Sequence, residues 1–447
     1  MQHPYNQTKQ HMERIVIVGG GAGGLPLATQ LGQRLGRKGK AEITLVDAAR
    51  THVWKPLLHQ LAAGSFDTHA EEIEYLAQAR WNHFRFRLGR MAAIDRAARV
   101  VELAATHDER GAEIAPAQRV PYDRLILCVG SLTNDFGTPG ADAHSIKLDT
   151  PQAARRFNER LVNACLRAHS LPGDDPGARW SVVIVGGGAT GVELAAELHS
   201  AARVLSSYGM DHVHPQADMR IVLIEAAPRL LSQLPERLGH AAVRELRKLA
   251  VEVHTGETVV EVTPHSVRTA SGQQIESTIT VWAAGVKAAE ELRGLGGAEP
   301  LEHNRLNQLL VDGNLQTTRD PRIYALGDCA ACPQEGGRWV PPRAQAAHQQ
   351  AMYLVKALPR LMAGQPVAPF RFQDQGSLVS LSEYSSVGSL MGSLSRGSLF
   401  VEGQLAKLMY WGLHKQHQLA LGGLKKTALI TLSEAIDRAH RPRIKLH

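Results

Sequence analysis

Cysteines and long apolar runs are scarce in this sequence. Its 447 residues include four cysteines (Cys128, Cys165, Cys329 and Cys332), too few for a disulfide framework, so we expect a reducing compartment. No stretch reaches the roughly 18 uninterrupted apolar residues that a membrane-spanning helix needs, and residues 1–12 are polar, unlike a signal peptide. These absences predict a soluble or peripheral protein rather than an integral membrane protein.

Metal-binding clusters and hydrolase motifs are also missing from the sequence. Its 21 histidines lack the paired spacing that is typical of metal ligands, so we expect no metal site. The chain does contain 44% hydrophobic residues and 41 glycines, a composition typical of a globular α/β protein. Its length predicts about two to three domains. The formal net charge of +7 would indicate an anionic partner if the basic residues cluster.

One group of glycines follows an apolar run near the N-terminus. The stretch RIVIVGGGAGG places Gly19, Gly21 and Gly24 in a G-x-G-x-x-G pattern, a helical pattern follows, and a second apolar run ends at Asp47. In a dinucleotide-binding fold the first glycine allows a tight turn, the second lets the backbone approach a pyrophosphate, and the third lets helix and strand pack closely. The helix N-terminus attracts the phosphates, and Asp47 is placed to bind a ribose diol.

The same pattern occurs a second time. The stretch WSVVIVGGGATG places Gly186, Gly188 and Gly191 after an apolar run, and MRIVLIE ends at Glu225. A loop at SSYGMDHVHPQAD accounts for the long gap between them. Because Glu225 would repel a 2′-phosphate and no Lys or Arg follows before Arg229, we predict NAD(H) rather than NADP(H) at this site.

Two dinucleotide patterns in one chain predict two dinucleotides, a permanently held flavin and a visiting nicotinamide. One copy could instead be purely structural. Tyr122–Ser131 and Ser277–Val286 are apolar runs that we expect to be the closing strands of the two halves. A later run ends at Gly327 and Asp328, so the chain is expected to return to the first domain. Asp328 would bind cofactor hydroxyl groups or cap a following helix.

These motifs together resemble those of a known family. The two glycine patterns, WAAG and YALGDCA are similar to the two-dinucleotide flavoprotein reductases. THVWKPLLHQLAAGS, VGGGATGVELAAELH and PPRAQAAHQQ narrow the resemblance to type II NADH:quinone oxidoreductases, over essentially the whole chain. The resemblance implies a single-subunit, non-proton-pumping respiratory enzyme with FAD in its first Rossmann-like domain and NADH in its second. It implies FAD binding by Gly19, Gly21, Gly24, Asp47, Lys55 and Asp328, and NADH binding by Gly186, Gly188, Gly191 and Glu225, with Glu193 near the nicotinamide.

The resemblance also gives PPRAQAAHQQ a role. In the family, an Ala-Gln-x-Ala-x-Gln helix lies beside the flavin ring where quinone arrives, and Ala344, Gln345, Ala347 and Gln349 reproduce that pattern. Residues four apart share a helical face, and a neutral amide can donate to and accept from quinone oxygens. Small alanines, Ala344 among them, let a flat cofactor ring approach the backbone. We therefore predict Gln345, Gln349 and Glu193 as catalytic residues, and a solvated polar face is the alternative for the two glutamines.

Cys329 and Cys332 form a Cys-x-x-Cys pair that supports a competing interpretation. Such a pair in a flavoprotein can be the redox site of a soluble NADH-dependent reductase of a disulfide or protein acceptor. Packing of small residues at a helix start, or metal binding, are the other interpretations. Cys128 and Cys165 do not clearly match the separated catalytic cysteines of the related sulfide:quinone oxidoreductases.

The chain ends in a basic, amphipathic stretch that starts at Gln404. Leu429, Leu432, Ile436 and Ala439 fall at helical spacing, and Gly422-Gly423 is expected to divide two helices. With Tyr410 and Trp411, the stretch predicts a peripheral anchor on an anionic lipid surface. The alternatives are a dimerisation helix and a helix packed on the protein's own core; nucleic acid is not favoured, because no binding motif is present. The basic residues are Lys407, Lys415, Lys425, Lys426, Arg438, Arg441, Arg443 and Lys445, against the acids Glu434 and Asp437.

The sequence thus predicts an α/β protein of four segments. Residues 1–150 and 301–370 are expected to form a discontinuous FAD-binding domain, 151–300 an NADH-binding domain, and 371–447 a membrane-associating region. The expected activity is NADH oxidation with reduction of a membrane quinone, ubiquinone or menaquinone, at the cytoplasmic face of the cell inner membrane. A homodimer is compatible with this expectation. A non-enzymatic NADH sensor that binds partners through its tail is a further alternative.

Overall fold

The protein forms two compact units that alternate along the chain. A computed structural model describes residues 12–66, 72–171, 175, 179–207, 218–381, 385–391, 398–402 and 404–437. The first unit comprises residues 1–52, 73–131 and 287–372, and the second comprises 53–72, 132–286 and 373–447. Within the described ranges, no helix is long and apolar enough to span a bilayer.

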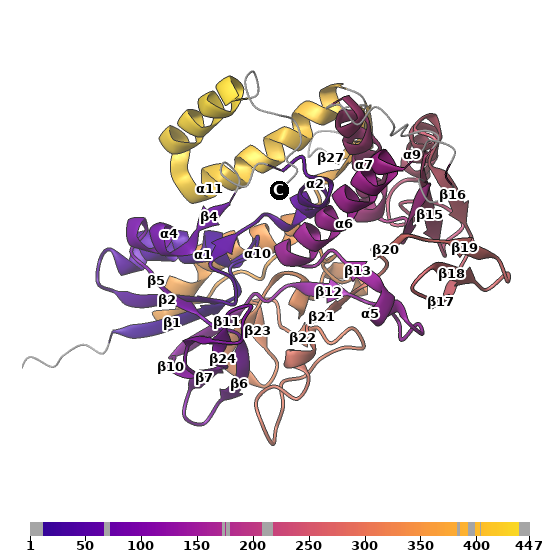
Figure 1. Cartoon of the computed structure of the whole chain (residues 1–447). Coiled ribbons are helices and arrows are strands. Elements are labelled where there is room, and N and C mark those ends of the chain that lie inside the picture. The colour runs from indigo at the N-terminus through magenta and orange to yellow at the C-terminus, as the bar shows by residue number, and fades with distance from the viewer. Residues whose placement is uncertain are drawn as a thin grey trace, which may run out of the picture. The chain divides into compact units, whose positions relative to one another are not determined.

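The first unit is built on a six-stranded sheet with the strand order β23-β24-β11-β1-β2-β5 (Figure 1). Its strands are β1 (Glu13–Val18), β2 (Ala41–Asp47), β5 (Arg85–Leu88), β11 (Arg124–Leu127), β23 (Gln316–Thr317) and β24 (Asp320–Ala325). All neighbouring strands are parallel except β23 and β24. The apolar run of β1 is buried from Ile15 to Val18, as expected for a central strand of a parallel sheet.

Two helices of the first unit position its predicted site residues. Helix α1 (Gly24–Leu31) starts at the end of the first glycine loop, continues into the π-helical turn Gly32–Gly36, and packs against α10 (Ala344–Met362). Strand β24 pairs with β11, although the end of β11 at Leu127 and the start of β24 at Asp320 are about 190 residues apart in the chain. The first unit is therefore discontinuous. The carboxyl ends of β1 and β11, between which the strand order reverses, mark the edge where a dinucleotide binds in such sheets.

The other elements of the first unit are short. They are β3 (Thr51–His52), β4 (Ile73–Glu74), α4 (Tyr75–Trp81), β6 (Met91–Asp95), β7 (Val100–Leu103), β8 (Thr106–His107), β9 (Glu113–Ala115), β10 (Gln118–Pro121), the 3₁₀ turns Glu290–Leu292, Gly327–Cys329 and Glu335–Gly337, β22 (Leu309–Leu310) and β25 (Ala330–Ala331). Strands β12 (Ser131–Thr133) and β21 (Val286–Ala288) lie where the chain passes from one unit to the other.

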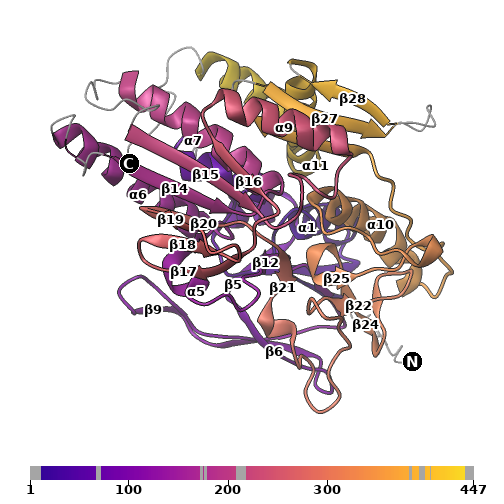
Figure 2. The same cartoon turned by 90° about the vertical axis from the view of Figure 1, so that its right-hand side faces the viewer.

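The second unit has a five-stranded parallel sheet with the order β13-β20-β14-β15-β16 (Figure 2). Its strands are β13 (Ser145–Lys147), β14 (Trp180–Val185), β15 (Met219–Glu225), β16 (Glu252–Thr255) and β20 (Ile279–Trp282). Among the described residues before the C-terminal part, the helices of this unit are α2 (Leu58–Ala63), α5 (Ala141–His144), α6 (Pro151–Ser170), α7 (Ala189–Ser207) and α9 (Glu236–Lys248), with a 3₁₀ turn at Lys55–Leu57. A small antiparallel sheet holds β17 (Val259–Val262), β18 (Ser266–Thr269) and β19 (Gln274–Glu276). The closing strands expected near Tyr122–Ser131 and Ser277–Val286 are β11 and β20, each beside its first strand.

The C-terminal part of the chain belongs to the second unit. Strands β26 (Gly376–Leu381), β27 (Ser385–Met391) and β28 (Ser398–Glu402) form an antiparallel sheet, and α11 (Gln404–Asp437) follows. Strand β26 contacts α7, and α9 contacts β27. Non-helical backbone at Gly423, with φ 70° and ψ 174°, divides α11 into two parts, as the glycine pair predicts.

The unit boundaries differ from those expected from the sequence. The chain changes unit after Ser131 and after Val286, not near residues 150 and 300, and residues 53–72 belong to the second unit. Residues 373–447 are part of the second unit rather than a separate region. The sequence marks strands and helices through local patterns, but which sheet a connecting segment packs on depends on distant residues. Most of the predicted loop at 206–218 lies outside the described residues, which omit 208–217.

Candidate functional site: two nucleotide loops and a buried acid

The first glycine loop has the backbone geometry of a phosphate-binding turn. Gly19 has φ +99°, a conformation that other residues rarely adopt, and a Cβ atom on Gly24 would collide with the Gly19 carbonyl oxygen. A Cβ on Gly21, in contrast, would meet no atom within 4 Å. The loop therefore leaves open space beside Gly21, as a bound pyrophosphate requires.

Asp47 closes this loop at the end of β2. Its Oδ2 accepts the Gly20 N–H at 2.6 Å and its Oδ1 accepts the Ala49 N–H at 2.8 Å. Burial raises the pKa of Asp47, and these backbone hydrogen bonds act against that rise. The buried Tyr75 donates from its hydroxyl to the Gly20 carbonyl at 3.0 Å and also bonds to Asp47. Sequence reasoning missed Tyr75, because a tyrosine at a helix start carries no motif.

The second glycine loop repeats this arrangement in the second unit. Gly186 has φ +115°, a Cβ on Gly191 would collide with the Gly186 carbonyl oxygen, and a Cβ on Gly188 would meet open space. Glu225 accepts the Gly187 N–H at 2.6 Å through Oε2 and the Ala227 N–H at 2.7 Å through Oε1. Both loops thus have a strand-end carboxylate bound to backbone N–H groups, and both leave room for a dinucleotide.

Basic side chains lie near the carboxyl end of β15, which carries Glu225. The Arg229 guanidinium donates to the Leu231 and Ser232 carbonyl oxygens at 3.2 and 2.6 Å, which holds it within its own turn. A cavity of about 670 Å³ is lined by Pro228, Arg229, Gly239, His240, Val243, Arg244, Arg247, Lys248 and Thr255. The preference for NADH over NADPH, drawn from Glu225, therefore stays a prediction.

Asp328 lies at the carboxyl end of β24 in the first unit. Its carboxylate accepts the Ser131 hydroxyl at 2.7 Å, and its backbone carbonyl accepts the Gln308 amide at 2.9 Å. The residue sits in a single 3₁₀ turn, and the next long helix, α10, begins at Ala344. Asp328 therefore does not cap α10, and a cofactor-binding role stays the prediction for it.

Helix α10 brings the predicted alanines and glutamines beside the first glycine loop. Ala347 is buried, and its carbonyl oxygen would lie 3.1 Å from a Cβ on Gly23, so the contact between helix and loop is tight. Gln345 and Gln349 are half-buried on this helix. Gln350, which sequence reasoning did not select, is buried and accepts the Gly327 N–H at 2.7 Å through its Oε1. The helix thus fixes the Gly-Asp turn through Gln350 and presents the other two amides at a partly open face.

Glu193 is buried in a polar cluster of the second unit. Its Oε1 accepts the Ser380 N–H at 3.0 Å, and its Oε2 lies 3.5 Å from His59 Nδ1. One helical turn along α7, Glu197 accepts a hydrogen bond from the Ser65 hydroxyl. Helix α2, helix α7 and strand β26 together supply these groups.

The charge state of this cluster follows from its burial. Burial is the largest effect on Glu193 and raises its pKa to about 8, with Glu197 adding to the rise and the Ser380 hydrogen bond acting against it. Burial likewise lowers the pKa of His59 to about 4, against a hydrogen bond to the Pro56 backbone. At neutral pH the Glu193 carboxyl group therefore holds a proton and His59 is a neutral imidazole.

Lys55 belongs to the second unit, unlike the other residues predicted to bind FAD. Its ammonium group lies 3.4 Å from an Asp149 carboxylate oxygen and its side chain is 47% exposed. Asp149 also accepts the Thr133 N–H at 3.0 Å and its hydroxyl at 2.9 Å. FAD binding by Lys55 stays a prediction.

The cysteines do not have the properties of a reactive pair. All four are buried and none forms a disulfide. Cys329 donates to the Leu127 and Leu326 carbonyl oxygens, and Cys332 follows strand β25 rather than opening a helix, which corrects the expected placement at a helix start. Burial raises the pKa of each thiol to about 11, so neither is a thiolate at neutral pH. Across the described ranges, no group of three or more His, Cys, Asp or Glu is placed to hold a metal ion.

Each of the two sheets carries a glycine loop that is open at its second glycine and bound by a strand-end carboxylate, an arrangement typical of dinucleotide-binding oxidoreductases. The model of the pyridine nucleotide-disulphide oxidoreductase family matches residues 13–351. A type II NADH:quinone oxidoreductase from Haemophilus influenzae is 42% identical, with 98% of this chain and 100% of that protein covered. The chain belongs to the type II NADH:quinone oxidoreductases within this family.

More distant relatives agree with this assignment. The type II NADH:quinone oxidoreductase Ndh from Mycobacterium tuberculosis is 28% identical, over 96% of this chain and 89% of that protein. A solved structure of NDH2 from Plasmodium falciparum in complex with NADH has a TM-score of 0.81 at 19% identity, covering 97% of this chain and 100% of that chain. At that identity the structural match supports the fold alone.

Proposed function

We propose that this protein oxidises NADH and reduces a membrane quinone through a bound FAD, without pumping protons. The observation that carries the proposal is the pair of glycine loops, each open at its second glycine and closed by a carboxylate. The family assignment favours this reading over a disulfide reductase, and the buried, protonated Cys329 and Cys332 agree with it.

Each nucleotide has a fitting set of residues in one unit. In the first unit, Gly21 and the N-terminus of α1 would face the FAD pyrophosphate, while Asp47 and Asp328 would accept hydrogen bonds from its hydroxyl groups. In the second unit, Gly188 and Glu225 would serve NADH in the same way. When bound, FAD supplies the chemistry that accepts a hydride and passes two electrons to the acceptor.

The protein's own residues would handle protons and quinone orientation. Oxidation of NADH by a quinone takes up one proton for each quinol formed, and the Glu193 carboxyl group holds one at neutral pH. We place Glu193 in that proton supply. Gln345 and Gln349 would orient the quinone through their amides, because they lie one helical turn apart on the partly open face of α10.

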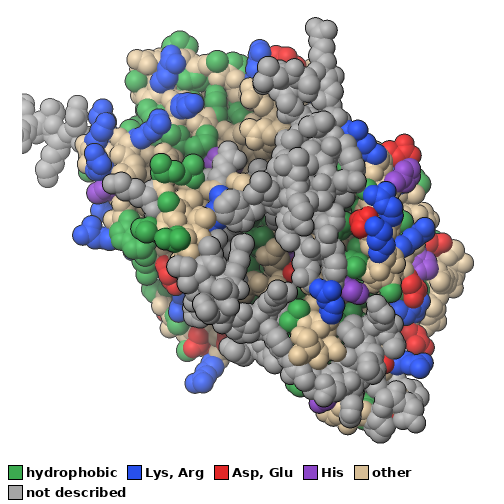
Figure 3. Space-filling view, turned by 90° about the horizontal axis from the view of Figure 1, so that it is seen from above, with side chains coloured by type: hydrophobic (Ala, Val, Ile, Leu, Met, Phe, Trp, Pro, Cys, Tyr) green, Lys and Arg blue, Asp and Glu red, His purple; other side chains and the backbone are tan. Residues whose placement is uncertain are grey.

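We place membrane attachment on the second part of α11, where the most exposed described leucines of this helix lie. In the first part, Lys415, His417, Gln418 and Leu421 are buried, and the His417 ring stacks on Trp54 at 5.7 Å. Lys415 donates to the Gln418 side-chain oxygen at 2.8 Å, so we do not count its charge among those that would face lipid. Beyond Gly423, Leu424, Leu429 and Leu432 are 77%, 68% and 60% exposed. Figure 3 shows hydrophobic side chains and Lys and Arg side chains on the face of the molecule that is seen from above, and the side chains of Lys425 and Lys426 are not among the described ones.

This exposed leucine face would insert into a bilayer at the cytoplasmic side of the cell membrane. Each leucine would contribute about 1.5–3 kcal/mol when buried, and each nearby basic residue about 1 kcal/mol on anionic lipid. Arg438, Arg441, Arg443 and Lys445 lie outside the described residues. A homodimer through the same face is the competing use of these leucines.

The absorption spectrum of the purified protein tests the core of the proposal. We expect flavin bands that bleach when NADH is added without oxygen and return when a short-chain quinone follows. A preparation that stays flavin-free after reconstitution with FAD would contradict the proposal.

Replacing Gln345 with Leu tests the quinone site. The variant is expected to slow the return of the flavin bands with quinone by about tenfold or more, because a hydrogen bond to the quinone is lost, and to leave bleaching by NADH unchanged. Stopped-flow measurement of both half-reactions separates the two. A loss confined to the NADH half-reaction would refute the assignment of α10.

A pair of leucine variants tests the membrane face. Leu429→Gln should weaken binding to vesicles of anionic lipid by about tenfold or more. Leu76→Gln is the matched control, because Leu76 is also 68% exposed but lies on α4 in the first unit. Equal vesicle binding by both variants would contradict the anchor, and a change in molecular mass with Leu429→Gln alone would indicate a dimer face.

A further inference from the structure

Phe136 is an exposed aromatic residue in a backbone conformation that side chains rarely adopt. It follows strand β12, its side chain is 67% exposed, and its φ is +54°. A left-handed backbone at a bulky residue costs the folded state free energy, and such outliers concentrate at functional sites. Because the ring is mostly exposed, its partial burial does little to offset that cost. The residue therefore needs another explanation.

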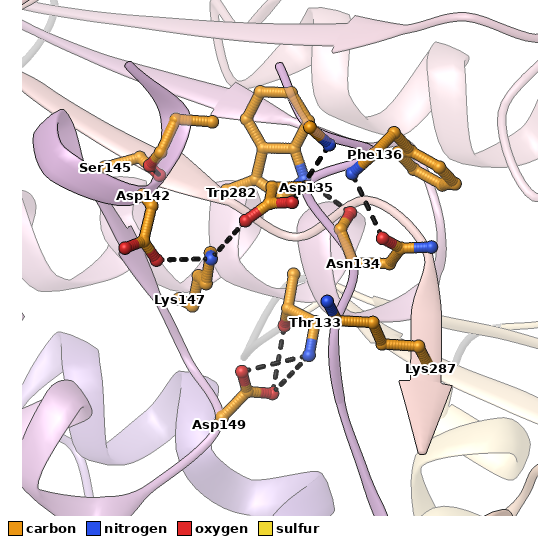
Figure 4. A network of polar contacts seen from close by, with 12 residues as sticks. Thr133, Asn134, Asp135, Phe136, Asp142, Ser145, Lys147, Asp149, Trp282 and Lys287 are labelled. Atoms are coloured by element: carbon orange, nitrogen blue, oxygen red, sulfur yellow. Dashed lines mark hydrogen bonds and ion pairs between the residues drawn. The ribbon is translucent and has the colours of Figure 1, made fainter. Parts of the chain in front are cut away.

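A polar network holds Phe136 in this conformation (Figure 4). Asn134 accepts the Phe136 N–H at 3.0 Å through its side-chain oxygen, and its own backbone carbonyl accepts the Trp282 indole N–H at 3.0 Å. Asp135 accepts the Gly137 N–H at 3.1 Å. Lys147 then bridges Asp135 and Asp142, with both nitrogen–oxygen distances 2.7 Å. The turn is thus tied to the buried Trp282 and is not a free surface loop.

The Phe136 ring lies against the backbone of Gly285. A Cβ atom on Gly285 would stand only 2.8 Å from the Phe136 Cε2 atom, and Gly285 itself has φ +66°. The Asn134 N–H donates to the Gly285 carbonyl at 3.3 Å. Gly285 is the third residue after the end of β20, so the ring lies beside the segment that leaves the carboxyl end of that strand. A glycine at this position makes room for the aromatic ring.

The sheet order places this ring on one side of the second glycine loop. Strand β14 carries the loop and lies between β15, which ends at Glu225, and β20. A Cβ on Gly186 would lie 2.6 Å from the Ala284 nitrogen, so the loop and the segment after β20 are in contact. A dinucleotide with its adenosine ribose at Glu225 and its pyrophosphate at the loop must extend past β14 toward β20. Its nicotinamide half then reaches the segment that Phe136 covers.

We propose that Phe136 is an NADH-contacting residue whose ring provides an apolar face for the dihydronicotinamide half of the substrate. This inference rests on the proposed function, because it takes NADH as the ligand of the second unit. An exposed aromatic ring next to an accessible backbone suits a flat, weakly polar ring, whereas the phosphates and adenosine ribose are served by the loop and Glu225. The strained backbone keeps the ring in place before the substrate arrives.

Phe136→Gly is the decisive variant, because glycine adopts a positive φ without strain while losing the ring. We expect its melting temperature to equal or exceed that of the wild-type protein. We expect KM for NADH to rise about three- to tenfold, the range for one aromatic contact, with kcat at saturating NADH and KM for quinone unchanged. Phe136→Tyr, which keeps the ring, should restore the wild-type KM. His83→Gly is the matched control: His83 is exposed with φ +58° in the first unit, and its replacement should leave KM unchanged.

A substrate fragment identifies the half of NADH that the ring contacts. ADP-ribose lacks the nicotinamide, so its inhibition constant should be the same for the wild type and Phe136→Gly. Equal weakening of NADH and ADP-ribose, or a lower melting temperature with unchanged KM, would overturn the inference and leave Phe136 a structural residue. If NADH fails to bleach the flavin of the wild-type protein, the proposed function fails instead.

Discussion

Replacing Glu193 with Gln is expected to stabilise the protein by an amount that grows with pH. Burial raises the pKa of this carboxyl group from its ordinary 4.5 to about 8, so the folded protein keeps a proton that the unfolded chain releases. For such a group the wild-type stability is fully present below about pH 4.5 and is lost progressively as the pH rises to about 8. A glutamine side chain stays neutral at every pH, so the variant does not lose this contribution to its stability as the pH rises.

The size of the effect follows from the same two values. Between the unfolded and the folded pKa, each pH unit lowers the free energy of unfolding by about 1.36 kcal/mol. The interval from 4.5 to about 8 therefore lowers it by an amount on the order of 5 kcal/mol. The amide oxygen of Gln can still accept the Ser380 N–H, and the altered contact with His59 should cost about 1 kcal/mol. The titration of His59, lowered to about 4, occurs in both proteins and cancels in their difference.

Thermal unfolding from pH 5 to 8.5 provides the measurement. The melting temperature of Glu193→Gln minus that of the wild type should be near zero or slightly negative at pH 5 and clearly positive at pH 8.5, at about 2–4 °C for each kcal/mol. Glu236→Gln is the control in the same unit, because Glu236 is 73% exposed, and its difference should stay flat. A Glu193→Gln difference that does not change with pH would mean that the buried carboxyl group is ionised in the folded protein, and the argument from burial would be wrong.

Four further predictions concern the nucleotide sites and the cysteines. Gly188→Val should raise KM for NADH about tenfold or more without lowering the melting temperature, because its side chain would enter the open space of the loop; Gly21→Val should instead yield protein with little bound flavin, measured by its absorbance ratio. Glu225→Gln should reduce the ratio of kcat/KM for NADH to that for NADPH by about tenfold, since a charged hydrogen-bond acceptor is lost, and an unchanged ratio would show that Glu225 does not discriminate. The double variant Cys329→Ser/Cys332→Ser should reduce quinone at the wild-type rate, because both thiols are buried and protonated; a large loss of rate would revive the disulfide reductase.

The glycine loops were predictable because their signal is local. A strand, a G-x-G-x-x-G turn, a helix and a second strand ending in an acid lie within one continuous segment, and each glycine has a role that its neighbours determine. The structure gives Gly19, Gly24, Gly186 and Gly191 the steric roles expected of them. Asp47 and Glu225 also bind the loop backbone, a role that spacing alone does not reveal.

The cluster around Glu193 was not predictable, because distant segments assemble it. His59, Ser65 and Ser380 come from parts of the chain far from α7, and no spacing rule connects them. The burial of Lys415 escaped prediction for a similar reason: a basic residue on an amphipathic helix is normally exposed, and the contact with Gln418 depends on how α11 packs on its own unit. Beyond Gly423, Leu429 and Leu432 of the predicted pattern are exposed.

The carboxylates that bind the loop backbone have a kinetic consequence. Glu225 accepts the Gly187 N–H of the glycine loop and the Ala227 N–H two residues after itself, and we expect these hydrogen bonds to hold the loop in one shape before NADH binds. NADH would then bind a preformed glycine loop, and its binding free energy would not include the entropy cost of ordering that loop. We likewise expect the departure of NAD⁺ to leave the same preformed loop for the next NADH molecule, with no refolding of the loop between turnovers.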